Sequence, residues 1–212
     1  VDLGAGPLSP TTGKLAENLR GAGYGPRDID TVLITHAHPD HVGGTLDGAG
    51  SLRFPDARYF VWRTEWDYWF SEAAEKVSWE HIDFTAIARR NLAPLKPHLT
   101  LVEDEREILP GVAMVNAAGH TPGHVIICFS SRGETLAYAA DTAIYPLHLE
   151  HPGWLPVFDM LPDQAAASKR RIFDRAAAEK WLVMAQHFPP FPSLGHIQKR
   201  DEGWTWVPAL GE

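Results

Sequence analysis

The sequence is poor in cysteine, in positive charge and in long apolar runs. Cys128 is the single cysteine, so no disulfide can form within the chain. Lysine and arginine total 19 against 27 aspartates and glutamates, which gives a formal net charge of −8. This balance disfavours binding to nucleic acid, because neutralising phosphates requires basic side chains. No apolar run reaches the roughly 18 residues of a membrane span, so we predict no membrane insertion.

The length and composition are those of a globular protein. Of the 212 residues, 44 % are hydrophobic and 22 % are charged, which allows a proper core to be buried. No repeat or linker divides the chain, and we predict a single domain over residues 1–212. The chain begins with neither Met nor a signal sequence. We expect a shortened N-terminus and, by default, a cytoplasmic location, although the sequence leaves the compartment open.

Histidine and tryptophan, by contrast, are abundant, with 11 and 8 residues. Three imidazoles and one carboxylate lie within six positions, directly after the apolar run 31–35 that predicts a buried strand. They are His36, His38, Asp40 and His41. Alternation along an extended backbone places the first two on one side, and the turn at Pro39 directs the others to a neighbouring position. The pattern indicates two adjacent metal ions; a His-rich polar loop without metal is the alternative.

Three further residues of metal-binding type each follow an apolar run that predicts a strand. They are His120 after 112–115, Asp141 after 136–140 and His187 after 181–186. If these runs lie in a layered sheet structure, one sheet edge gathers seven metal ligands. Donors mounted on strand ends are held rigidly, which a catalytic metal site requires.

These motifs resemble the metallo-β-lactamase superfamily. The carrying residues are the His-x-His-x-Asp-His motif at 36–41, the segment 120–124 (His-Thr-Pro-Gly-His), Asp141 and His187. Their order and separations match over essentially the whole chain. The resemblance implies an α/β (α+β) fold, an αββα sandwich with a dinuclear site at one edge of its sheets. Because the family has further strands before the segment that matches 1–6, we expect this sandwich to lack the first N-terminal strands.

Carried over to this sequence, the resemblance implies two divalent metal ions. One would be bound by His36, His38 and His120, the other by Asp40, His41 and His187, with Asp141 bridging. Imidazole and carboxylate donors without thiolate favour zinc, and iron, manganese or cobalt also accept such donors. A hydroxide shared by two metals would attack a carbonyl or phosphoryl centre. Asp40 is the group that we expect to shuttle a proton to the leaving group.

Among the branches of the superfamily, the residues favour lactonases and organophosphate hydrolases. Cys128 lies inside a predicted strand, which disfavours β-lactamases with a cysteine ligand, and the acidic charge disfavours RNA-processing nucleases. The strings at 60–66 and 187–192 look like those of relatives of methyl parathion hydrolase and of quorum-quenching lactonases. We predict hydrolysis of an apolar small-molecule lactone, ester or organophosphate. The alternatives are a glyoxalase II-like thioesterase, a β-lactamase-type hydrolase, or a truncated homologue that binds metal without catalysis.

A substrate with apolar bulk needs aromatic walls. We predict that Trp154 and Phe158, in the irregular loop after Asp141, supply them, and that Tyr145 hydrogen-bonds a carbonyl oxygen; packing is the alternative role for each. The aromatic segment 64–92 is predicted to be a helical pair that covers the core or also lends wall to the cleft. Asp2 is predicted to accept a hydrogen bond from a ligand imidazole, with an ordinary turn residue as the alternative. An uncovered sheet edge makes a homodimer compatible with the sequence.

Overall fold

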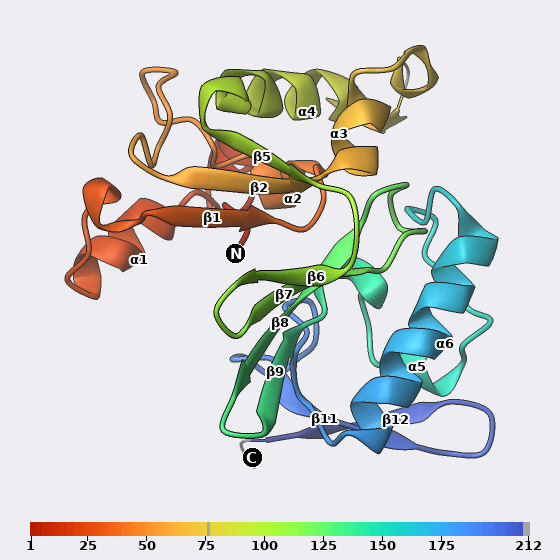
Figure 1. The fold of residues 1–212 in the computed structure, drawn as a ribbon. Helices are drawn as coiled ribbons and strands as arrows, with labels where there is room; N and C mark the ends of the chain where they lie inside the picture. The colour runs from red at the N-terminus through yellow and green to blue at the C-terminus, as the bar shows by residue number, and fades with distance from the viewer. Residues whose placement is uncertain (76, 210–212) are drawn as a thin grey trace. The chain divides into compact units, whose positions relative to one another are not determined.

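The computed structural model describes residues 1–75 and 77–209. Contacts along the chain divide it into two compact units, unit 1 (Val1–Glu103) and unit 2 (Asp104–Glu212). Each unit combines strands with helices (Figure 1), which confirms the mixed α/β class predicted from the sequence. The prediction of one single domain stays a prediction.

Unit 1 contains a parallel sheet of three strands in the order β1-β2-β5. The strands are β1 (Thr31–Ile34), β2 (Arg58–Trp62) and β5 (Leu99–Val102). Parallel strands are normally buried on both faces and therefore form nearly continuous apolar runs. That holds here, because Val32, Leu33 and Ile34 are at most 5 % exposed.

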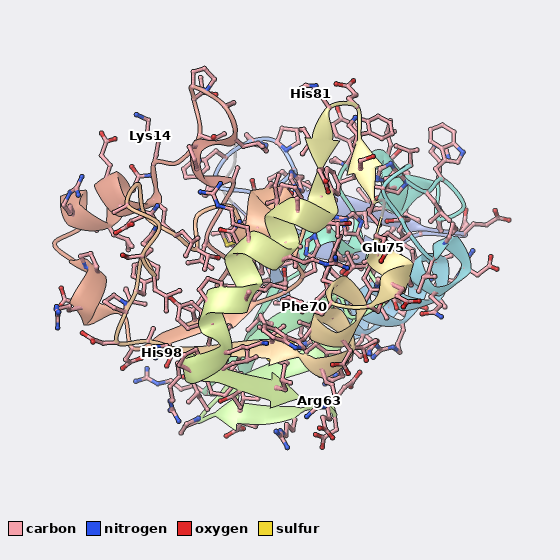
Figure 2. All side chains as sticks on the ribbon, turned by 90° about the horizontal axis from the view of Figure 1, so that it is seen from above. Lys14, Arg63, Phe70, Glu75, His81 and His98 are labelled. Atoms are coloured by element: carbon pink, nitrogen blue, oxygen red, sulfur yellow. The ribbon has the colours of Figure 1, made fainter. Side chains whose placement is uncertain are left out.

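The helices of unit 1 are short and lie between these strands in sequence. They are η1 (Gly6–Leu8), α1 (Leu15–Gly21), η2 (Pro26–Asp28), α2 (Pro39–Val42), α3 (Arg63–Trp69), η3 (Glu72–Ala74), α4 (Phe84–Leu92) and η4 (Ala93–His98). Helix α3 packs against β2, β5 and α4. In the view of Figure 2, α4 crosses in front of the strands of this unit. The segments α3 to η4 thus provide the crossover that parallel strands β2 and β5 need.

The prediction of a purely helical segment over 64–92 is wrong for its middle. Between α3 and α4 the chain forms the antiparallel hairpin β3 (Ser78–Trp79) and β4 (Ile82–Asp83). Glu80 turns the chain with a positive φ of 51°, and His81 lies at the tip (Figure 2). The Asp83 carboxylate then accepts a hydrogen bond from Ala86 N, 2.8 Å away, and so begins a new helix at its N-cap.

Unit 2 contains a seven-stranded sheet in the order β12-β11-β10-β9-β8-β7-β6. Its strands are β6 (Arg106–Leu109), β7 (Val112–Asn116), β8 (Val125–Ser131), β9 (Glu134–Tyr138), β10 (Leu182–Met184), β11 (Leu194–Lys199) and β12 (Trp204–Pro208). Consecutive pairs are antiparallel except β9 and β10, which pair in parallel. The sequence predicts a C-terminal hairpin of runs 197–199 and 204–206, and β11–β12 confirm it. It also predicts a β-rich meander over 99–140, but Leu99–Val102 at its start instead pairs in parallel with β2.

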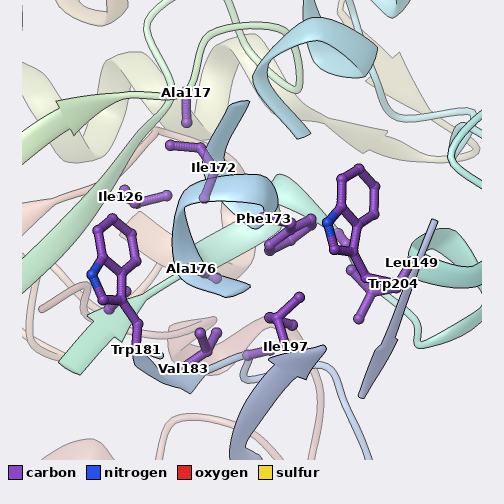
Figure 3. Packing of buried hydrophobic residues seen from close by; sticks show 14 of the residues in the cluster. Ala117, Ile126, Leu149, Ile172, Phe173, Ala176, Trp181, Val183, Ile197 and Trp204 are labelled. Carbon is purple, nitrogen blue, oxygen red and sulfur yellow. The ribbon is translucent and has the colours of Figure 1, made fainter. Parts of the chain in front are cut away.

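Helix α6 (Pro162–Ala178) supplies the crossover between β9 and β10 and covers the core of unit 2. Figure 3 shows Ile172, Phe173 and Ala176 of this helix among side chains from the sheet. The shorter elements η5 (Ala140–Thr142) and α5 (Leu147–Glu150) precede it. None of the helices in residues 1–75 and 77–209 has the length and apolar character that crossing a bilayer requires.

Candidate metal centre

The histidine cluster of unit 1 begins where β1 ends. Pro39 is the first residue of α2, where its fixed φ suits a helix start and its missing N–H costs nothing. The ring centroid of His36 lies 4.8 Å from that of His38 and 4.0 Å from that of His41. All three imidazoles are buried. The Oδ2 atom of Asp40 lies 3.4 Å from Nε2 of His41. Unit 1 therefore brings together the four donors that the sequence predicted as one cluster.

Asp2 supports this cluster from the N-terminal segment. Its carboxylate accepts hydrogen bonds from Thr35 N and Thr35 Oγ1, each 2.8 Å long. Its Oδ2 atom also lies 2.7 Å from Nδ1 of His41, which confirms the predicted hydrogen bond to an imidazole. A carboxylate at Nδ1 keeps the proton on that nitrogen, so Nε2 retains its lone pair for a metal.

Two glycines allow the N-terminal segment to approach α2 this closely. A Cβ atom on Gly43 would lie 2.4 Å from Ala5 O, and one on Gly44 would lie 2.1 Å from Leu3 O. Leu3 N also donates a hydrogen bond of 2.7 Å to His41 O. Because no side chain could fit at these positions, the backbone of residues 3–5 lies directly against the turn that carries His41.

Glu65 is a supporting residue that sequence reasoning missed. Its carboxylate is fully buried and accepts hydrogen bonds from Ala37 N at 2.8 Å and Trp69 Nε1 at 2.7 Å. It therefore fixes the backbone between His36 and His38. A glutamate surrounded by tryptophans in the sequence is the signal that could have found it, since an acid among aromatic residues needs buried partners.

In unit 2 the three predicted ligands meet at one carboxylate. The Oδ2 atom of Asp141 lies 3.2 Å from Nε2 of His120, and its Oδ1 atom lies 3.4 Å from Nε2 of His187. His120 follows β7, Asp141 lies in η5 directly after β9, and His187 follows β10. The Asp141 carboxylate thus directs one oxygen at each of two imidazole nitrogens.

The surroundings of His120 favour positive charge. Burial lowers the pKa of this imidazole, but the carboxylates of Asp141 and Asp159 outweigh the effect and raise the pKa to about 9. The Oδ1 atom of Asp159 lies 2.9 Å from Nδ1 of His120. This is the same carboxylate–imidazole pairing that Asp2 makes in unit 1. Asp159 was not predicted, because it lies 39 residues beyond its partner in the sequence.

Asp141 is itself held by neighbouring residues. Gln186 Nε2 donates a hydrogen bond of 2.7 Å to Asp141 Oδ1, and Asp141 N donates one of 3.1 Å to His124 Nε2. Nδ1 of His124 lies 3.1 Å from Ala117 O, so His124 donates through Nδ1 and accepts through Nε2. His124 thereby fixes the backbone of Asp141.

The donor set fits divalent transition metals. Seven residues offer potential donor atoms: His36, His38, Asp40, His41, His120, Asp141 and His187. In each unit a buried carboxylate holds Nδ1 of one imidazole and leaves Nε2 as the donor. Imidazole and carboxylate without thiolate is a combination that zinc accepts readily.

The predicted substrate residues lie between η5 and α6 in unit 2, Tyr145 before α5 and Trp154 and Phe158 after it. Trp154 is 56 % exposed and stacks on His151 with ring centroids 4.2 Å apart, while Tyr145 is 49 % exposed. Phe158 is half-buried. Val157, next to Phe158, adds further exposed apolar surface. Their part in substrate binding stays a prediction.

Comparison with known sequences identifies the family. A model of the metallo-beta-lactamase superfamily matches residues 6–187. The N-acyl homoserine lactonase AiiA of Bacillus thuringiensis subsp. kurstaki is 25 % identical over 179 residues, which is 82 % of this chain and 62 % of that protein. The chain thus spans less than two thirds of the length of this relative.

Solved structures agree with this result. The hydrolase AbOPH of the beta lactamase superfamily is 28 % identical with a TM-score of 0.88. AidC, a dizinc quorum-quenching lactonase solved in complex with a product, is 28 % identical with a TM-score of 0.89. Each comparison covers 100 % of this chain and 75 % of the solved chain. Since the family model matches most of the sequence, the chain belongs to the metallo-beta-lactamase superfamily.

Proposed function

We propose that this protein is a dinuclear zinc hydrolase of apolar lactones, with esters and organophosphates as further substrates. In this proposal His36, His38 and His120 bind one metal, Asp40, His41 and His187 bind the other, and Asp141 bridges them. The observation that carries it is the Asp141 carboxylate, with one oxygen directed at His120 and the other at His187.

The residues of the chain have distinct tasks in this reaction. A bound metal pair would supply a hydroxide that is nucleophilic near neutral pH. Gln186 and His124 orient Asp141 from two sides, so its oxygens are fixed before substrate binds. Asp40 has a side chain that is 42 % exposed, against 6 % for Asp141. Asp40 is therefore the carboxylate that can exchange a proton with water and the leaving group.

Lactones are the favoured substrates in this proposal because two relatives are named as lactonases. AiiA is named an N-acyl homoserine lactonase and AidC a quorum-quenching lactonase. The exposed aromatic side chains of Trp154 and Tyr145 add apolar surface that an acyl chain can contact.

A homodimer remains part of the prediction, and sedimentation of the purified protein tests it.

Metal analysis combined with a substrate panel tests the function. We expect two zinc ions per chain and turnover of an acyl lactone, with slower turnover of an aryl ester or an organophosphate. Two bound metals without turnover of any of the three would refute the hydrolase, and a chain that binds no metal would refute the centre itself.

Asp141→Asn tests the bridging role. The substitution removes the negative charge but keeps the shape, so we expect weakened binding of one metal and hydrolysis slowed by about 100-fold or more. Asp163→Asn, in the exposed first turn of α6, is the matched control and should match the unchanged protein in both properties. Full metal content and full rate in the Asp141 variant would remove the bridge from the proposal.

A further inference from the structure

A lysine occupies the apolar face of helix α6. The buried positions of this helix follow the spacing of one helical stripe and are Ala165, Lys169, Ile172, Phe173 and Ala176. An apolar residue is expected at every such position. Lys169 is nevertheless 0 % exposed. Burying an ammonium group costs several kcal/mol unless it is compensated, so this lysine requires polar partners in the core.

The ammonium group of Lys169 faces the loop that precedes α6. Its Nζ atom donates a hydrogen bond of 3.2 Å to Trp154 O. Burial lowers the pKa of Lys169, the negative charge of Asp159 opposes this, and Arg170 adds a smaller lowering effect. The same ammonium helps to lower the pKa of the neighbouring His148 imidazole, where burial is the larger cause. The Lys169 ammonium therefore interacts electrostatically with the buried carboxylate of Asp159 and with the half-buried imidazole of His148.

The segment from Trp154 to Asp159 is fastened at both ends. Lys169 holds its first residue through the carbonyl of Trp154. At the other end Asp159 contacts Nδ1 of His120 at 2.9 Å, and the next residue, Met160, donates through its backbone N–H to His120 O at 3.1 Å. The segment 154–159 is therefore fixed at one end by Lys169 and at the other by the contacts with His120.

We propose that Lys169 is a positioning residue for the metal centre: it holds the segment 154–159 so that the Asp159 carboxylate stays on Nδ1 of His120. The inference rests on the proposed function, because it assigns His120 as a metal ligand. It explains why a charged residue occupies a buried position of α6, since carboxylates behind a ligand imidazole fix its orientation and basicity.

Zinc affinity of the purified full chain, measured by competition with a chromophoric chelator, tests this role. Lys169→Met removes the charge and the donor at similar length. We expect about tenfold weaker binding of one of the two zinc ions. Lys169→Gln, which keeps an N–H donor for Trp154 O, should lose less affinity, and it replaces the methionine variant if circular dichroism shows that variant unfolded.

Two further variants separate positioning from general damage. Arg170→Met removes an equal charge from the exposed neighbour on α6 and should leave both zinc affinities unchanged. In an Asp159→Asn background, Lys169→Met should cause no additional loss, because the path through Asp159 is already weakened.

Each outcome decides the question. Unchanged zinc affinity in the Lys169 variants, with two zinc ions bound by the parent chain, would overturn the positioning role and leave the proposed function standing. Additive losses in the Asp159→Asn background would overturn the path through Asp159. A parent chain that binds no zinc would overturn both proposals.

Discussion

At the scale of single residues, two imidazoles of the candidate site have their second nitrogen held by a carboxylate. Asp2 holds Nδ1 of His41 and Asp159 holds Nδ1 of His120. Each pairing sets the tautomer and prevents ring rotation, so the donor nitrogen is oriented before any metal arrives. Histidine and aspartate side chains alone are common in proteins. The buried carboxylates behind two of the imidazoles are what distinguish this site from an ordinary polar cluster.

Asp2→Asn tests the pairing in unit 1. The backbone of Asp2 has a positive φ of 49°, a conformation that asparagine tolerates well, so the substitution removes mainly charge. We expect zinc affinity to fall by about tenfold or more. The exposed Asp67→Asn on α3 is the control. Equal affinities of the two variants, measured by chelator competition, would mean that the Asp2 charge does not support His41.

The residues of the candidate metal centre could be predicted from the sequence, whereas most of the residues that support them could not. Metal-binding side chains are unusually dense at His36, His38 and His41. The other three, His120, Asp141 and His187, each follow an apolar run. Asp159 and Gln186 show no comparable local pattern, because they gain their role only when α6 and β10 bring them to His120 and Asp141. Asp2 was found because it ends a strand-like run beside the cluster.

At the scale of elements, helix α6 and the loop after β7 form one tightly fitted assembly. Ser168 Oγ donates a hydrogen bond of 2.6 Å to Ala118 O. Gly119 lies so close to the helix that a Cβ atom would be 2.1 Å from Ala165 N, and its φ is +140°. The backbone that presents His120 is therefore pressed against a rigid helix.

Gly119→Ala tests this close approach. The added methyl group would meet backbone atoms that cannot move aside, and the φ value is strained for any L-residue. We expect a loss of more than about 3 kcal/mol in the free energy of unfolding. Gly133→Ala has a positive φ of 82° but open space around its Cβ, so only about 1 kcal/mol should be lost. Urea denaturation measures both, and similar losses would contradict the steric explanation.

The elements themselves were predicted where periodicity and turn signals are local. The strand over 31–35, a helix from Asp163 to about Ala178 and the C-terminal hairpin were predicted from such patterns. The assignment of β5 failed because parallel pairing with β2 is set by a crossover of more than 30 residues, which no turn residue reveals. The prediction of a helix over 64–92 missed the β3–β4 hairpin because the aromatic residues of this segment are also common in strands.

At the scale of the whole molecule, the protonation of His120 makes the stability of the metal-free protein depend on pH. In the metal-free protein the pKa of His120 is raised to about 9, above the roughly 6.5 of an unfolded histidine. The folded state therefore holds this proton more tightly. The resulting stabilisation is complete below about pH 6.5 and is lost as the pH rises toward about 9.

Chemical denaturation of the metal-free protein across pH 6 to 9 measures this effect. We expect the free energy of unfolding to fall over this range, and the fall to shrink in His120→Gln, which cannot titrate. The same slope in both proteins would assign the pH dependence to other groups.

The single cysteine gives the molecule a reporter of its own motion. Cys128 lies in β8 within the core that α6 covers, and burial raises the pKa of its thiol to about 11. A thiol reagent can therefore react only when that core opens. We expect slow alkylation in native buffer, fast alkylation in urea, and a further slowing by zinc if the metal binds at His120 and Asp141. Fast native alkylation would contradict the closed core. Mass spectrometry of one alkylated site can thus follow the opening of the core beneath α6 with no engineered label.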